Sequence, residues 1–186
     1  MKPFLFSFLL LFALGEETSA QHRECKDCVE WKEGQRLKWS DFKGTPKRLS
    51  QNEALTDSGM SIALKCDNNT SEVIVKCFFD RTKSWTKDNK SAYLLAHEQL
   101  HFDITELFVR KLRKQLAGLG SDCQKLNDHV EKYYNENYKE YVAYQDAYDR
   151  ESEHSIDKKK QAYWEQKVAQ ELEELKPFAS LATNQQ

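Results

Sequence analysis

The spacing of apolar residues changes once along this 186-residue chain, and that change limits the fold. Between Met60 and Asp80, apolar and polar side chains alternate on both sides of an Asn-rich turn. Such alternation is typical of two antiparallel strands with one buried face. From Lys90 onward the apolar spacing becomes helical, and no glycine follows Gly120. The sequence therefore predicts an α+β protein in which an antiparallel hairpin is followed by helices.

Three helices are expected in the second half of the chain. The first covers residues 90–119 and ends at a pair of glycines, the second covers about 122–153, and the third about 157–175. Tyrosines recur at helical spacing along the second helix, and we expect them to pack in the core. Before the hairpin, residues 37–59 contain turn formers and aromatic anchors, which indicates a strand followed by a loop. The small N-terminal sheet should pack on the long first helix.

Residues 1–20 have the pattern of a secretory signal peptide. A single cation, Lys2, precedes an apolar run from Phe4 to Leu14, and small residues precede a cleavage point between Ala20 and Gln21. The run is shorter than the roughly 20 apolar residues that span a bilayer, and no later segment approaches that length. We therefore expect a secreted or periplasmic protein without a stable membrane anchor.

Removal of the signal peptide leaves 166 residues and changes the formal charge from -2 to -1. That length fits one domain, which we place at residues 37–178, with a polar lead-in at 21–36 and a frayed tail at 179–186. A chain with so little net charge has no strongly basic surface for phosphates, which argues against a nucleic-acid partner.

Five cysteines remain after cleavage, and export favours disulfides over free thiols. Cys66 and Cys77 flank the turn of the predicted hairpin, and we expect a bridge between them. The CKDC segment, Cys25 to Cys28, is compatible with redox chemistry or zinc, but its polar surroundings favour a local disulfide or a bond to Cys123. Because the number is odd, at least one thiol is free or pairs between chains.

The first predicted helix carries the sequence HEQLH. His97 and His101 are about 40° apart around a helix and one turn apart along it, so both imidazoles can reach one ion. Glu98 is rotated by about 100° from His97, which suits contact with a water on that ion better than coordination. This is the logic of the H-E-x-x-H motif: two imidazoles hold Zn²⁺, an open position keeps a water, and the glutamate accepts its proton.

An ordinary surface helix with two histidines is the competing interpretation. Apolar residues surround the motif, and a buried imidazole pair needs partners that a metal would supply. We therefore favour a metal site. Asp103 and Glu106 project away from the metal face, and we expect them to form salt bridges with residues such as Arg110.

A third protein ligand must come from another part of the chain. The segment YDRESEH, residues 148–154, is the best source among the remaining histidines and acids. If the second helix continues unbroken, helical phase favours Glu151 over His154. If it ends near Ser155, His154 is free to turn inward, and the spacing alone leaves both open.

Ordered blocks of the sequence resemble the bacterial domain of unknown function 922 family, described as predicted secreted zinc-dependent proteases. LKWSDFKGTP, at residues 37–46, resembles the opening W-x-D-F-x-G-x-P block of that family, and the Ser84-Trp85 pair resembles a short block before its helix. HEQLHFDI, at residues 97–104, is similar to its H-E-Q-x-H-F-D-I signature. YDRESEHS, at residues 148–155, is similar to Y-D-x-E-T-x-H-G and is followed by the Q-x-x-W of Gln161 and Trp164.

Two positions in the last of these blocks depart from the family pattern. Ser152 stands where the family has threonine, and Ser155 stands where it has glycine. A histidine followed by glycine is what a ligand at a helix end looks like, so the resemblance favours His154 as third ligand. Glu151 and Asp149 remain alternatives, either as ligand or as a residue that orients an imidazole.

These observations predict a secreted zinc metallopeptidase that hydrolyses peptides or proteins, with His97, His101 and His154 as ligands and Glu98 as general base. The strand near residues 73–79 would hold substrate as an added strand, and Tyr148 is an oxyanion donor or a core residue. The alternative is a non-catalytic secreted module in which zinc only ties two helices together. A thiol oxidoreductase that uses Cys25 and Cys28 is disfavoured, since no strand-to-helix context surrounds them.

Overall fold

The predicted hairpin is present as β3 (Ser58–Asp67) and β4 (Thr70–Asp80). The computed structural model describes residues 25–67 and 70–180, so the predicted signal peptide lies outside the described residues. The two strands pair antiparallel, with Ile62 opposite Val75 and Leu64 opposite Val73. The inward face of β4 is buried, as the alternation predicts; its members are Val73, Val75, Cys77 and Phe79. Together with the helices that follow, this confirms the α+β class.

The polar lead-in contains a third strand, which the sequence analysis did not predict. β1 (Cys28–Glu30) pairs antiparallel with β4, with Val29 opposite Phe79. Val29 is buried, and the Trp31 indole N–H donates to a carboxylate oxygen of Asp103 at 2.8 Å. The described part of the lead-in is therefore packed against the domain, through Val29, through the Trp31 indole and through the pairing of β1 with β4.

The loop before the hairpin also differs from its prediction. Residues 37–46 contain a 3-10 turn, η1 (Trp39–Asp41), in place of a strand, and a two-stranded sheet follows from β2 (Ala54–Leu55) and β5 (Trp85–Thr86). Gly44 donates its N–H to the Ser84 carbonyl at 2.8 Å, and a Cβ at that position would lie 2.8 Å from the same oxygen. Only glycine fits this close approach of two backbones.

The helix boundaries agree with the sequence to within two residues at each end. They are α1 (Ala92–Ala117), α2 (Cys123–Ser152) and α3 (Lys158–Glu174), and a short 3-10 turn, η2 (Lys176–Phe178), follows. Ser91, Asp122 and Asp157 cap the three N-termini with their side chains. Each cap satisfies backbone N–H groups that the first turn leaves unpaired, which is why these short polar residues mark the boundaries so clearly.

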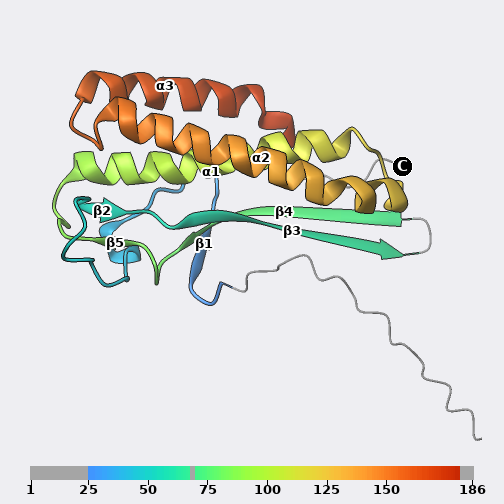
Figure 1. Cartoon of the computed structure of the whole chain (residues 1–186), viewed down its shortest axis with the longest axis horizontal. Helices are drawn as coiled ribbons and strands as arrows, with labels where there is room; N and C mark the ends of the chain where they lie inside the picture. The colour runs from blue at the N-terminus through green and yellow to red at the C-terminus, as the bar shows by residue number, and fades with distance from the viewer. Residues whose placement is uncertain (1–24, 68–69, 181–186) are drawn as a thin grey trace, which may run out of the picture.

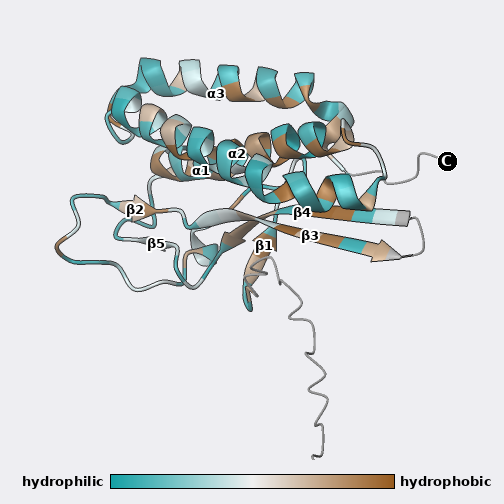
Figure 2. Cartoon of the chain, turned by 45° about the vertical axis from the view of Figure 1, so that its right-hand side comes forward, coloured by the Kyte–Doolittle hydropathy of each residue, from teal (hydrophilic) through white to brown (hydrophobic). Residues whose placement is uncertain are grey.

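Helix α1 lies between the sheet and the other two helices (Figure 1). It packs on β3 and β4 on one side and on α2 and α3 on the other. Figure 2 shows hydrophobic residues along β1, β3 and β4, while most of the visible outer side of α3 is hydrophilic. The single core is therefore built around α1, which has 16 buried residues among its 26.

The expected Cys66–Cys77 disulfide is wrong. In the hairpin register Cys66 lies opposite Ser71, and Cys77 lies opposite Met60, six positions away along β3. Six residues of strand extend about 20 Å, whereas a disulfide needs Cα atoms within about 7 Å of each other. Cys66 bonds instead to Cys123 at the start of α2, Cys25 bonds to Cys28 as the local alternative predicted, and Cys77 is a buried free thiol.

Strand β4 is not available as a substrate-binding edge along its length. It is the central strand of the order β1-β4-β3, with β3 on one side and β1 on the other from Phe78 to Asp80. Where β1 has ended, the Val75 carbonyl accepts hydrogen bonds of 3.1 and 2.7 Å from the Arg113 guanidinium. The interpretation of residues 73–79 as an exposed edge is therefore wrong.

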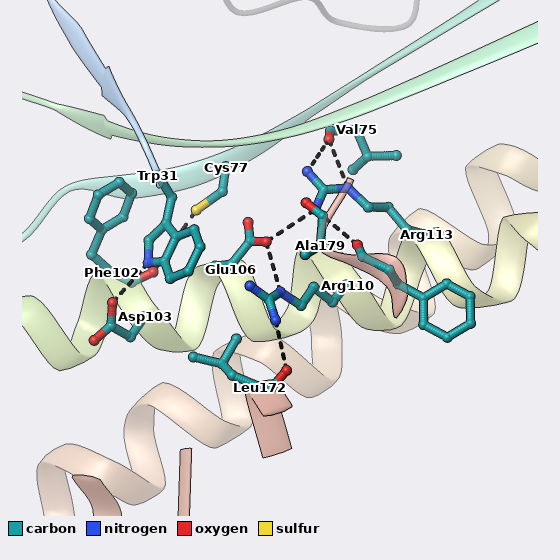
Figure 3. A network of polar contacts seen from close by, with 11 residues as sticks. Trp31, Val75, Cys77, Phe102, Asp103, Glu106, Arg110, Arg113, Leu172 and Ala179 are labelled. Atoms are coloured by element: carbon teal, nitrogen blue, oxygen red, sulfur yellow. Dashed lines mark hydrogen bonds and ion pairs between the residues drawn. The ribbon is translucent and has the colours of Figure 1, made fainter. Parts of the chain in front are cut away.

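A buried ionic network ties the C-terminal half of α1 to its neighbours (Figure 3). Glu106 accepts from Arg110 at 3.0 Å and from Arg113 at 3.1 Å, which confirms the expected salt bridge with Arg110. Arg110 also donates to the Leu172 carbonyl in α3, and Arg113 donates to the Ala179 carbonyl after η2. The first residue of the predicted tail is thus held by a guanidinium, and α1 fixes both β4 and the end of α3.

We expect Arg113→Met to lower the free energy of unfolding by about 3–5 kcal/mol, because it removes one of the two cationic partners of the buried Glu106 and the donor to the carbonyls of Val75 and Ala179. Urea denaturation followed by circular dichroism measures this. Lys132→Met is the control: its exposed pair with Glu136 should contribute less than about 1 kcal/mol. Equal losses in the two variants would contradict a structural role for the network.

Candidate metal centre

The two histidines of the motif face one another within the structure. The His97 Nε2 and His101 Nε2 atoms are 3.2 Å apart, and the side chains are 4% and 14% exposed. Both residues lie in α1 and its helical repeat places them one turn apart, as the spacing predicted. The motif is therefore not on a solvated helix face, and its imidazoles meet inside the molecule.

Asp149 of α2 brings a carboxylate to the same point. Its Oδ1 atom lies 3.2 Å from His97 Nε2 and 3.0 Å from His101 Nε2, so the three atoms form a nearly equilateral triangle. Ligands of a tetrahedral zinc ion at about 2.0–2.2 Å stand roughly 3.3–3.6 Å from each other. The triangle is close to one face of such a tetrahedron, and its two imidazoles and one carboxylate are a ligand set that zinc accepts.

Several buried polar atoms around the triangle have no hydrogen-bond partner. Within the described residues seven buried side-chain atoms are in this position, and three of them are His97 Nδ1, Glu98 Oε2 and Asp149 Oδ1. Asp149 Oδ1 nevertheless lies within 3.0–3.2 Å of both imidazole Nε2 atoms and pairs with whichever of them carries a proton. Unsatisfied buried polar atoms are costly, about 1–3 kcal/mol each, so three in one cluster call for an explanation. A cation between the ligand atoms would engage Asp149 Oδ1, and a water on that cation would reach Glu98 Oε2, whereas His97 Nδ1 lies on the far side of its ring from the triangle.

The charges of the three side chains are coupled. Burial lowers the pKa of His97 below its usual value, although Asp149 acts in the opposite direction. Burial also opposes charge on His101, but Asp149 outweighs it and raises the pKa of His101 to about 9. The two imidazoles likewise outweigh burial at Asp149 and hold its pKa well below the usual range. Coordination requires neutral imidazoles, so metal binding here would release the His101 proton.

Two residues of α2 support the histidines: Gln145, which the sequence analysis did not assign to the site, and Tyr148, which it named as an oxyanion donor or a core residue. Gln145 Oε1 lies 2.6 Å from His101 Nδ1, and its amide donates to the His101 carbonyl at 2.9 Å. Tyr148 is fully buried, with its ring 4.7 Å from the His97 ring and 4.9 Å from the His101 ring. Burial raises the pKa of Tyr148, and its hydroxyl points to the His97 carbonyl, so it is a packing residue.

Glu98 is 3% exposed and lies beside the triangle on α1. Its carboxylate charge acts on both histidines, which places it within electrostatic reach of the ligand atoms. The Thr56 hydroxyl, directly after β2, donates to the Glu98 carbonyl at 3.1 Å and ties the backbone of this helical turn to the loop that leads into β3. Glu98 is therefore held in position by its backbone, while one carboxylate oxygen remains without a hydrogen-bond partner.

His154 lies at the rim of the site and not within the triangle. Its side chain is 61% exposed, and its Nδ1 is 3.6 Å from Asp149 Oδ1. Glu153, His154 and Ser155 all have left-handed backbone angles, so α2 ends sharply here without the glycine of the family pattern. Glu151 points elsewhere and accepts from the Trp164 indole at 3.2 Å. His154 as third ligand stays a prediction, and the distances favour Asp149.

A cavity lies on the opposite face of α1. It measures about 570 Å³ and is lined by the 31–37 segment, by α3 and by Leu95, Gln99 and Asp103 of α1. Gln99 accepts from the Leu37 N–H at 2.7 Å and donates to Asp103 at 2.8 Å. These two residues of the HEQLHFDI block therefore attach the N-terminal segment to α1, and they take no part in the metal cluster.

Comparison with known families agrees with the resemblance read from the sequence. Residues 79–155 match the model of the family described as Bacterial protein of unknown function (DUF922). That range includes β5, the whole of α1 and α2, and all the residues of the triangle. The searches of curated proteins and of solved structures gave no significant match.

The disulfides bear on where the protein acts. Its described cysteines form two disulfides, which persist in oxidising compartments. No helix in residues 25–67 or 70–180 has the length and apolar character needed to cross a membrane.

We expect Asp149→Ala to weaken zinc binding by at least about 100-fold, because it removes one of the three candidate ligand atoms. His154→Ala should weaken it by less than about tenfold, since this imidazole is outside the triangle. Competition with a chromophoric chelator measures both constants. A greater loss in His154→Ala than in Asp149→Ala would assign the third ligand to His154.

Proposed function

We propose that this protein is a secreted zinc-dependent metallopeptidase. The observation that carries the proposal is the triangle of His97 Nε2, His101 Nε2 and Asp149 Oδ1, with edges of 3.0–3.2 Å, beside the buried carboxylate of Glu98. Three protein ligands and an open fourth position distinguish catalytic zinc sites from closed structural ones. The signal peptide read from the sequence and the two disulfides support an exported enzyme.

His97, His101 and Asp149 would hold the ion, and a bound zinc ion supplies polarisation of the scissile carbonyl and a water whose pKa is about 7. Glu98 would act first as general base and then as general acid, carrying a proton from the attacking water to the leaving amine. Its unpartnered Oε2 suits this role, because no protein donor has to be displaced first. Tyr148 contributes by fixing both imidazole rings through packing.

The alternative, a non-catalytic module with structural zinc, uses the same three ligands. It gains some support from the position of the triangle between α1 and α2, since a metal bound there would link the two helices whether or not it is catalytic. The two readings differ at Glu98, which is needed for proton transfer and is not needed to hold zinc. Glu98 is therefore the residue that separates them.

We expect Glu98→Gln to keep bound zinc and to lower peptide cleavage by a factor of at least about 100, in line with the loss of a general base. Zinc content is measured by mass spectrometry of the metal, and cleavage by turnover of an unfolded protein substrate and of a peptide library. Glu140→Gln, at an exposed position of α2, is the matched control and should keep full activity.

The possible results distinguish the metallopeptidase proposal from the structural-zinc alternative. Zinc in the wild type without any cleavage that depends on Glu98 would establish the structural-metal alternative. One equivalent of another metal, such as iron, would overturn the zinc assignment, because two histidines and a carboxylate can also hold ferrous iron. A wild type that purifies without metal and binds none would contradict both readings.

A further inference from the structure

We propose that Gln145 is a positioning residue that fixes the tautomer of His101 and so directs its Nε2 lone pair at the metal. The proposal rests on the proposed function in one respect, namely that His101 is a ligand. Gln145 and Asp149 are one turn apart on α2 and meet the two nitrogens of the same ring. Gln145 Oε1 is 2.6 Å from Nδ1, and Asp149 Oδ1 is 3.0 Å from Nε2.

The orientation of the Gln145 amide follows from its second contact. Its Nε2 lies 2.9 Å from the His101 carbonyl, which is a pure acceptor, so the NH₂ group must face that carbonyl. The amide oxygen is then the atom that faces His101 Nδ1, and a carbonyl oxygen can only accept. His101 Nδ1 must therefore carry a hydrogen, and a neutral His101 has its lone pair on Nε2.

The same side chain holds the backbone of the helical turn. The His101 carbonyl accepts from Gln145 and also from the Thr105 hydroxyl, at 3.0 Å. Thr105 in turn is 2.7 Å from the Ser58 hydroxyl of β3. The ring and the backbone of His101 are thus both fixed from α2 and from the sheet, and the ring has little freedom to rotate away from the triangle.

His97 has no equivalent support. Its Nδ1 is buried without a hydrogen-bond partner, and its ring is oriented by packing against Tyr148 and by the contact of Nε2 with Asp149. His101 is therefore the ligand whose direction the protein sets by hydrogen bonding. A partner of this kind typically contributes 10- to 100-fold to metal affinity by orienting the imidazole and raising its basicity.

Three variants test the proposal by their affinity for Zn²⁺. Gln145→Leu removes acceptor and donor, and we expect zinc binding to weaken by about 10- to 100-fold. Gln145→Glu keeps an acceptor at Nδ1, and we expect its affinity to be within about threefold of wild type or tighter, since a carboxylate is a stronger acceptor. Gln124→Leu, at an exposed position in the first turn of the same helix, is the control and should bind as wild type does.

A second measurement does not depend on the variants' folding. In the zinc-loaded wild type, nitrogen-15 NMR of the imidazoles should find His101 Nδ1 protonated, with a proton that exchanges slowly, and Nε2 bound to metal. Protonation at Nε2, or coordination through Nδ1, would overturn the proposal. Melting temperatures are also measured with zinc and with excess chelator. If the role of Gln145 is purely structural, Gln145→Leu will lower both melting temperatures equally and leave the zinc affinity unchanged.

The outcomes for Gln145 and for peptidase activity are separate. If the wild type binds zinc and cleaves nothing, the peptidase proposal fails while the affinities and the NMR signals still decide the role of Gln145. If Gln145→Leu binds zinc as tightly as the wild type does, the positioning role fails and the peptidase proposal stands on Glu98 alone. A wild type that binds no zinc overturns both.

Discussion

The burial of α1 on most of its sides is the constraint on which the rest of this structure depends. A helix between a sheet and two other helices has little access to water, so every polar side chain on it needs a partner inside the protein. Six of its titratable or amide side chains are nonetheless buried: His97, Glu98, Gln99, Glu106, Arg110 and Arg113. The elements around α1 are placed where they supply partners for these buried polar side chains.

The two ends of α1 meet this requirement in different ways. Toward the C-terminus, Glu106 pairs with Arg110 and Arg113, and the spare donors of both guanidiniums reach backbone carbonyls of β4, of α3 and of the residues after η2. That network is satisfied by protein alone. Near the N-terminus, His97 Nδ1 and Glu98 Oε2 have no such partner, and His97 Nε2 meets only the His101 ring and the carboxylate of Asp149. This contrast within one helix is the physical reason to propose a ligand-binding role for His97 and Glu98 and a structural role for Glu106, Arg110 and Arg113.

Several features could be predicted from the sequence because they depend on local chemistry. The capping residues Ser91, Asp122 and Asp157 set the helix starts, the alternation in 60–80 set the buried face of the hairpin, and the spacing of His97 and His101 set their common direction. The expected disulfide failed because loop closure was inferred without the register, which separates Cys66 from Cys77 along the strands. Strand β1 in the lead-in was not predicted, because the attachment of this segment depends on contacts such as that of Trp31 with Asp103, 72 residues away.

The sequence by itself determined the class of fold, the helix boundaries and the two imidazoles of the candidate metal centre, since one helical turn brings those two rings together in any helix. The tertiary structure decided which acid joins them. Asp149, Glu151 and His154 are within five residues of each other, and only the packing of α2 against α1, together with the sharp left-handed end of α2, brings the first of them to the histidines. It also decided that Gln145 faces His101, because contacts between helices depend on their relative rotation, which the sequence of neither helix specifies alone.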